Sequence, residues 1–369
     1  QARALDPVVE RSVDDLSVGP IPIKRRTLDA AARIADDPIP VGSPDQPFAP
    51  LPDEATPRVI VSQSGVALPV LANGPSGWLV STACQAVQRV DGGTPVGRAH
   101  VVIDPGHGGV EPGAVGPAGT VEKDLNLTVA REAARLLTEA GATVVLTRDG
   151  DHTMTAAARG LVARSIAPAL FVSIHHNAGA PPGPGGPGTI VFTQTGSAES
   201  TRFGGLFHQA ITPILTQAAD EATARHQAWV EEVERHEAAR LAAPEGTEFP
   251  ELPEGEPVEP FQWAGSGNAG VRSWVRADGE DHLALLRHSG PSPAALVEFL
   301  YVSNPSEEAL LTSDGFLEAQ AAALADAIVQ FLGGQDGGTG FVDDQEGDQP
   351  IGGGGRIEDC VEPSLVDAG

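Results

Sequence analysis

The hydrophobic and polar positions of the chain change their period several times, and each change marks an expected element. Between residues 99 and 333, short apolar runs of strand type, such as VVID and FVSI, alternate with stretches of helical period. The clearest helical stretch covers 124–141, where apolar residues recur every three or four positions until Gly141. Strands that alternate with helices predict an α/β domain whose mixed, mostly parallel sheet is flanked by helices.

Other patterns surround this domain. From 58 to 93, β-branched and polar residues alternate between turn signals, which predicts a small β-module of three short strands. Residues 1–57 are rich in Pro and Asp without a sustained period, which predicts a disordered leader. Residues 334–369 are rich in Gly and Asp and are predicted to form a flexible tail. Within the α/β domain, a long helix is expected over about 199–243, followed by a Pro/Glu-rich loop.

Charge and hydropathy exclude two classes of partner. The chain has 50 acidic residues and 23 Lys plus Arg, a net charge of −27, and no basic run. Nucleic-acid binding needs clustered cations that neutralise phosphates, so we expect no nucleic-acid partner. No apolar run approaches the roughly 18 residues of a membrane span, so none is expected. The chain begins at Gln1, and we expect that an upstream segment has been removed.

The two cysteines, Cys84 and Cys360, lie far apart and do not have the spacing of a metal-binding pair. An even count fits one disulfide bond in an oxidising compartment, and two unrelated thiols are the plainer interpretation. We expect the disulfide, which would connect the tail to the β-module.

Three residues are candidates for a zinc site, which needs imidazole or carboxylate ligands on rigid elements and one open position. His107 lies in the glycine-rich run DPGHGG, Glu122 precedes the predicted helix, and His175 ends the strand FVSIH. Glu111 is an alternative to Glu122, but the glycines and proline around it would break a helix shared with His107. His176 competes with His175, because neighbouring strand residues point to opposite faces. The pattern alone leaves that choice open.

Four blocks then point to a family: VVIDPGHGGVEPGAVGPAGTVEKDLNLTVA, LTRDGD, FVSIHHNA and ALVEFLYVSN. In order and spacing they resemble the catalytic domain of zinc-dependent N-acetylmuramoyl-L-alanine amidases of the type 3 family, in particular those secreted by actinobacteria. The resemblance covers about 99–333 and is interrupted by a helical and Pro/Glu-rich insertion at about 215–262. It implies a Zn²⁺ cofactor, peptidoglycan as substrate, and hydrolysis of the amide between N-acetylmuramic acid and L-alanine. It also implies secretion to the cell wall or a periplasm-like space.

The resemblance assigns roles to residues by motif. His107, Glu122 and His175 correspond to the metal ligands, and Glu298 corresponds to the general base that accepts a proton from the attacking water. Asn177 and Arg148 correspond to candidate substrate-binding positions. Each has a plainer interpretation: a strand-end turn for Asn177, a structural salt bridge for Arg148, and a paired buried carboxylate for Glu298.

Two departures from the family pattern affect the expected function. Glu111 stands where the family usually has Asp, beside a metal ligand. In some family members an inserted helix blocks the site until an activator removes it, so we hypothesise an autoinhibitory role for the helix at 215–243. We expect a monomer. The competing hypotheses are a zinc peptidase of the cell wall and a catalytically silent, regulatory wall-binding protein.

Overall fold

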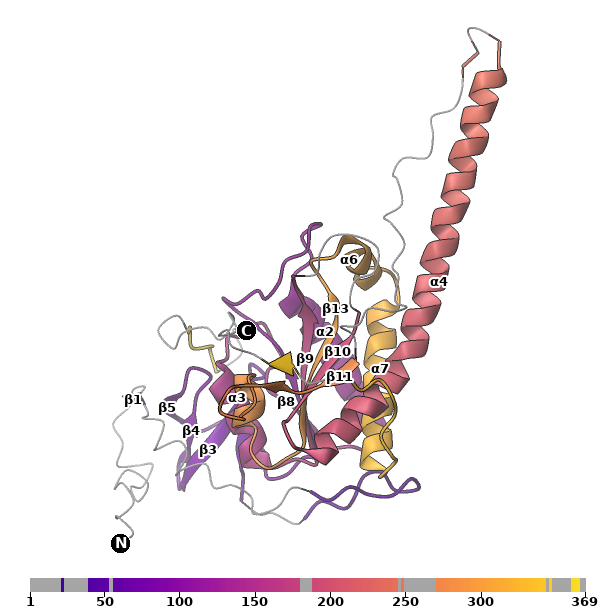
Figure 1. Cartoon of the computed structure of the whole chain (residues 1–369). Coiled ribbons are helices and arrows are strands. Elements are labelled where there is room, and N and C mark those ends of the chain that lie inside the picture. Colours follow the sequence, from indigo (N-terminus) through magenta and orange to yellow (C-terminus); the bar gives the residue numbers. More distant parts are fainter. Residues whose placement is uncertain are drawn as a thin grey trace.

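The structure is a computed structural model, which describes residues 21–22, 39–52, 56–179, 188–244, 247–248, 270–342, 345–346 and 360–365. At its centre lies a six-stranded sheet with the order β11-β10-β13-β9-β7-β8 (Figure 1). All neighbouring strands are parallel except β10 and β13. The strands are β7 (Val101–Pro105), β8 (Val144–Leu146), β9 (Leu170–Asn177), β10 (Ile190–Thr193), β11 (Gly270–Arg272) and β13 (Ala294–Tyr301). The predicted mixed, mostly parallel α/β sheet is confirmed.

Helices cover the two faces of this sheet unequally. Three long helices form a continuous hydrophobic core with one face: α2 (Glu122–Glu139), α4 (Ala198–Ala242) and α7 (Phe316–Leu332). The opposite face packs against shorter helices, α3 (Ala156–Ile166) and α5 (Ala284–His288), and against the β-module. Alternate residues of each central strand contribute to the two cores, as the pleat of a strand requires. A further short helix, α6 (Pro305–Leu311), follows β13.

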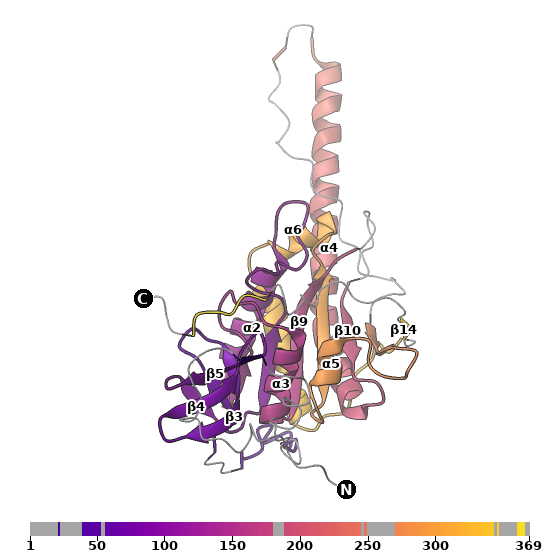
Figure 2. The same cartoon turned by 90° about the vertical axis from the view of Figure 1, so that its left-hand side faces the viewer.

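Helix α4 has a buried base and a projecting arm. Its buried side chains end at Ala218, and the helix then continues to Ala242 beyond the body of the molecule (Figures 1 and 2). At 1.5 Å per residue the segment 219–242 extends about 36 Å. Ion pairs at helical spacing, Glu221–Arg225 and Glu232–Arg235, lie on this arm and support it modestly.

The β-module contains more strands than the sequence pattern predicts. It comprises β2 (Val59–Val61), β3 (Ala67–Gly74), β4 (Gly77–Ser81), β5 (Ala86–Val90) and β6 (Thr94–Val96), and all their pairings are antiparallel. The prediction of three strands is therefore wrong. Strands β2 and β6 have three residues each, too few to display an alternating pattern. The module shares its hydrophobic core with α3 and the central sheet, so the two parts form one packed unit.

Parts of the leader and tail are packed rather than loose. Ile39 is buried in the core of the α/β domain, and the Gly42 amide donates to the carbonyl of Leu332 at 2.6 Å. In the tail, the Val271 amide of β11 donates to Gly340 at 2.8 Å, so the chain continues along the edge of the sheet. The residues 1–20, 23–38 and 53–55 of the predicted disordered leader, and most of 343–369, lie outside the described residues. A short strand, β1 (Ile21–Pro22), pairs with β5.

The predicted disulfide between Cys84 and Cys360 is present, and it fixes residues 360–365 against the β-module. The hydroxyl of Thr82 donates to the Glu362 carboxylate beside the bond. The tail is therefore covalently joined to the loop between β4 and β5, and the prediction of a flexible tail does not hold for these residues.

Among the described residues, no single helix has the length and apolar composition to cross a membrane. Helices α6 and α7 together have the length and apolar composition of a membrane span, but the pair is bent by 81° at its junction. Helix α7 buries most of its apolar side chains in the core of the domain.

Candidate metal centre

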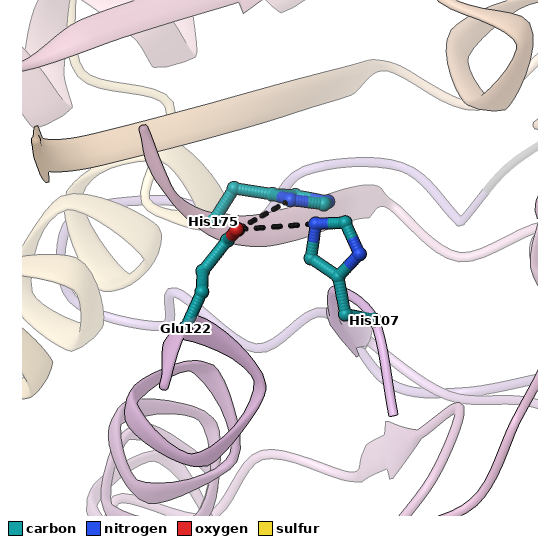
Figure 3. Close-up of side chains that lie close together, drawn as sticks. All are labelled: His107, Glu122 and His175. Carbon is teal, nitrogen blue, oxygen red and sulfur yellow. Dashed lines mark hydrogen bonds and ion pairs between the residues drawn. The ribbon is translucent and has the colours of Figure 1, made fainter. Parts of the chain in front are cut away.

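His107, Glu122 and His175 converge at the carboxyl-terminal edge of the sheet (Figure 3). One carboxylate oxygen, Glu122 Oε1, lies 3.2 Å from His107 Nε2 and 3.0 Å from His175 Nδ1. The two imidazole rings meet edge to face, with centroids 4.9 Å apart. Donor atoms about 2.0–2.1 Å from a tetrahedral ion are about 3.4 Å from one another. The observed spacing therefore fits three ligands of one metal ion.

The loop after β7 depends on glycines to bring these groups together. A Cβ atom on Gly106 would lie 2.3 Å from the His175 ring. Gly113 has φ +71°, and its Cβ would lie 2.4 Å from Glu122 Oε2. Any larger residue at either position would displace the side chain of His175 or Glu122. His107 itself has φ 59°, a conformation that non-glycine residues adopt only when the surroundings enforce it.

Two buried arginines enforce that loop conformation. Arg159 donates to the carbonyl oxygens of Pro105 at 2.7 Å and His107 at 2.6 Å. Arg148 donates to Pro105 at 3.0 Å and to Gly106 at 2.8 Å. Guanidinium groups suit this task because their several donors have a fixed planar geometry. The carbonyls of three consecutive residues, Pro105 at the end of β7 and then Gly106 and His107, are thus fixed by hydrogen bonds from the two arginines.

Arg148 is therefore not placed where a substrate could reach it. Its side chain is fully buried and is not among the residues that line the cavity. Its remaining donors go to the carbonyls of Gly150 and Lys123. The structure gives Arg148 the plainer, structural role, although through backbone carbonyls rather than the expected salt bridge.

Arg159, rather than Arg148, forms a buried salt bridge here. Its partner is Asp104, which the sequence analysis did not single out. Asp104 Oδ1 lies 2.7 Å from Arg159, and Ser173 donates to the other carboxylate oxygen at 2.7 Å. Burial favours the neutral acid, but the Arg159 charge and the hydrogen bonds outweigh it and lower the pKa of Asp104. Asp104 could have been predicted to have a cationic partner, because it lies in the apolar strand VVIDPG and a buried charge requires such a partner.

Glu122 is held in its ionised form. Its Oε2 accepts the Ala114 amide at 2.7 Å, and its Oε1 accepts the His176 amide at 3.2 Å. Burial would raise its pKa, but hydrogen bonds from His107 and His175 outweigh burial and lower the pKa. A carboxylate that stays ionised inside the protein is the form that binds a cation.

The structure separates the two neighbouring histidines. His175 faces the cavity, and burial lowers the pKa of its ring, which favours the neutral imidazole that ligates metals. His176 is fully buried on the other face of the sheet, where its Nδ1 lies 2.8 Å from Asn126 Oδ1. Its ring stacks on Phe299, and burial lowers its pKa to about 4. His175 therefore belongs to the centre, and His176 belongs to the core.

Glu298 lies directly beside His175, because the two residues are partners in the parallel pairing of β13 and β9. The residue keeps some exposed surface, but its Oε2 atom is buried and has no hydrogen-bond partner among the described residues. Burial and the nearby negative charge of Glu122 raise the pKa of Glu298 well above its usual range. A cation between these two carboxylates and the histidines would relieve both costs, so the residues fit a bound metal ion.

The centre opens into a cavity of about 1410 Å³. Its lining includes all four predicted catalytic and metal residues, and also Asn177, Glu111 and Tyr301. The Asn177 side chain accepts the Ala178 amide at 2.7 Å, as a strand-end residue does, while it faces the cavity. Glu111 lies at the rim and is not part of the three-residue cluster.

Helix α4 does not line this cavity in its described part. It packs against α7 and the sheet face opposite to the centre. The helical residues 215–243 therefore leave the site open in this conformation, which contrasts with the hypothesis of an autoinhibitory helix. Most of the Pro/Glu-rich remainder of the insertion lies outside the described residues.

Two imidazoles, one carboxylate and a neighbouring glutamate in an open cavity define a candidate centre of a metal-dependent hydrolase. Residues 101–241 match the family model described as N-acetylmuramoyl-L-alanine amidase. An amidase of this name, AmiC of Neisseria meningitidis serogroup B, is 28% identical over 235 residues, which are 64% of this chain and 53% of that protein. AmiA of Escherichia coli K12 is 26% identical over 239 residues, 64% of this chain and 77% of that protein.

Among solved structures, the amidase AmiC2 of Nostoc punctiforme is 25% identical with a TM-score of 0.42, and the match covers 63% of this chain and 96% of that one. The chain thus spans about half the length of the Neisseria relative and about three quarters of the Escherichia relative. Residues 101–241 of the α/β domain thus match the N-acetylmuramoyl-L-alanine amidase family model, and the domain is similar to these amidases.

Proposed function

We propose that this protein is a zinc-dependent amidase that hydrolyses the bond between N-acetylmuramic acid and L-alanine in peptidoglycan. The observation that carries the proposal is the convergence of His107, Glu122 and His175 beside Glu298 in one open cavity. The match of residues 101–241 to the N-acetylmuramoyl-L-alanine amidase family model suggests the substrate class.

The donor set favours zinc over other common divalent ions. Two imidazoles and one carboxylate form a known type of catalytic zinc site, whereas Mg²⁺ and Ca²⁺ prefer oxygen ligands throughout. When bound, zinc lowers the pKa of a water ligand towards about 7 and polarises the scissile carbonyl. The buried arginines behind the loop keep His107 in the orientation that this binding requires.

Glu298 is proposed as the general base. Glu298 is paired with His175 in the neighbouring strand and lines the same cavity, and its Oε2 atom has no hydrogen-bond partner among the described residues. There it takes a proton from the attacking water and delivers it to the departing amine of L-alanine. Asn177 is proposed to contact the substrate at the same strand edge. Both Glu298 and Asn177 line the cavity.

We further propose that the protein acts outside the cytoplasm, at the cell wall. The Cys84–Cys360 bond fits an oxidising compartment, where such bonds persist. The substrate polymer is located there as well.

Product analysis tests the proposal. Purified peptidoglycan digested by the full chain with Zn²⁺ should yield new L-alanine amino termini and peptide-free glycan. Release of D-alanine, or of new amino termini within the stem peptide, would assign a zinc peptidase instead. Digestion that yields no new termini while the protein still sediments with peptidoglycan would assign the silent, wall-binding alternative.

A further inference from the structure

One wall of the cavity is an aromatic hairpin, residues 274–282, which faces the same space as the metal centre. Trp274 stacks on His282 with centroids 4.2 Å apart and planes inclined by 19°. Phe192 of β10 lies against the same indole at 5.5 Å. All three rings line the cavity, although the sequence pattern did not mark them as functional.

The aromatic hairpin is held rigidly. The amides of Arg276 and His282 donate to Glu280 and Trp274 at 2.9 and 2.6 Å, which closes the turn. At its base, Asp281 accepts from both the amide and the hydroxyl of Thr195, at 2.7 and 2.6 Å. Arg287 of α5 donates to the carbonyls of Asp281 and His282. Such preorganisation lowers the entropic cost of binding a ligand.

The chemistry of this wall selects between the two halves of the proposed substrate. The stem peptide carries carboxylates, whereas a sugar ring offers a neutral apolar face surrounded by hydroxyl groups. The aromatic hairpin carries three acidic side chains and one basic one, and Arg276 is already paired with Asp278 at 2.8 Å. A carboxylate gains little there, while an aromatic surface in a cavity binds flat apolar faces well.

We infer that the aromatic hairpin is a sugar-binding wall, on which Trp274 receives a pyranose ring of the glycan while the amide bond lies at the metal centre. The inference rests on the proposed function and adds the direction in which the substrate lies across the cavity. The glycan extends towards the hairpin, and the stem peptide extends away from it.

Binding without turnover separates the sugar from the peptide. The Glu298→Gln variant of the full chain is titrated with a peptide-free N-acetylglucosamine–N-acetylmuramic acid disaccharide and, separately, with free stem peptide, by ligand-observed NMR. We expect Trp274→Ala to weaken disaccharide binding about 10-fold, the change that about 1.4 kcal/mol produces. Trp274→Phe should restore most of it, and stem-peptide binding should not change.

Trp229→Ala is the matched control, because Trp229 lies on the projecting arm of α4 and does not line the cavity. In turnover, Trp274→Ala should raise KM on glycan-containing substrate with kcat within about twofold of the parent, since the wall binds but does not react. Circular dichroism and metal content check that each variant is folded.

Unchanged disaccharide binding in folded Trp274→Ala would overturn the inference, and so would weakened binding of the stem peptide alone. These results are distinguishable from failure of the proposed function. In that case the parent chain would cleave no N-acetylmuramoyl–L-alanine bond, whether or not disaccharide binding depends on Trp274.

Discussion

The two faces of the central sheet place neighbouring histidines of one strand in contrasting surroundings. On the face covered by α2, α4 and α7, His176 is fully buried and forms a hydrogen bond with Asn126. The other face packs against α3 and α5, and there His175 faces an open cavity together with His107 and Glu122. The comparison shows that helix coverage, not residue type, decides which histidine is available to a metal ion.

Replacing each histidine in turn should have the largest effect and should separate the roles of the two residues. His175→Ala should lose the metal ion and reduce hydrolysis by about 10³-fold or more, because one of three ligands is gone. His176→Gln should keep about one metal ion per chain and lower the free energy of unfolding by about 1–3 kcal/mol. Elemental analysis and thermal unfolding measure the two effects. Loss of metal in the His176 variant alone would reverse the assignment.

The next effect concerns the stability that the disulfide bond between the β-module and the tail contributes. Replacing both Cys84 and Cys360 with Ser should lower the free energy of unfolding by about 2–5 kcal/mol, because the bond closes a long loop in the unfolded chain. Denaturant unfolding measures it. Reduction should destabilise the parent chain by a similar amount and leave the double variant unchanged. An equal effect of reductant on both proteins would contradict the account.

A smaller effect on metal binding should follow when the loop after β7 loses the hydrogen bonds that hold its carbonyls. Arg159→Met removes the donors to the carbonyls of Pro105 and His107, so metal affinity should fall about 10- to 100-fold. Chelator competition measures the change. Arg131→Met is a matched control, because Arg131 forms only an exposed pair with Asp149. Equal metal affinity in both variants would show that the loop holds its shape without Arg159.

The last comparison is between two buried acids: Asp104 has a cationic partner, whereas Glu307 has none among the described residues. Burial raises the pKa of Glu307 to about 7, and only the Tyr301 amide opposes this shift. The folded state therefore holds a proton that the unfolded state releases near pH 4.3, so the free energy of unfolding should fall by about 3–4 kcal/mol as pH rises from about 4.3 to beyond 7.

Urea unfolding of the parent chain at pH 5 and pH 8 should show this loss of stability, and Glu307→Gln should remove it. A parent and variant with the same pH dependence would indicate that Glu307 is ionised throughout.

The sequence predicted those features that depend on local pattern. Strand and helix alternate with periods that a short window reveals, so α2 and β9 lie within two residues of their expected bounds. The choice of His175 over His176 depended on family resemblance, because the pattern does not say which face of β9 a helix covers. The sequence left Arg148 between a substrate contact and a structural salt bridge, because hydrogen bonds from a buried guanidinium to backbone carbonyls leave no pattern in the sequence. The aromatic hairpin was missed because its rings meet only through tertiary packing.

The most direct test of the central claim is a paired measurement on the parent chain and Glu298→Gln: zinc bound per chain and the rate of N-acetylmuramoyl–L-alanine hydrolysis. The account predicts about one zinc ion in both proteins, and a rate in the variant lower by about 10²- to 10⁴-fold. An unchanged rate would place the base elsewhere. Loss of zinc from the variant would contradict the division of the site into three ligands and a separate base.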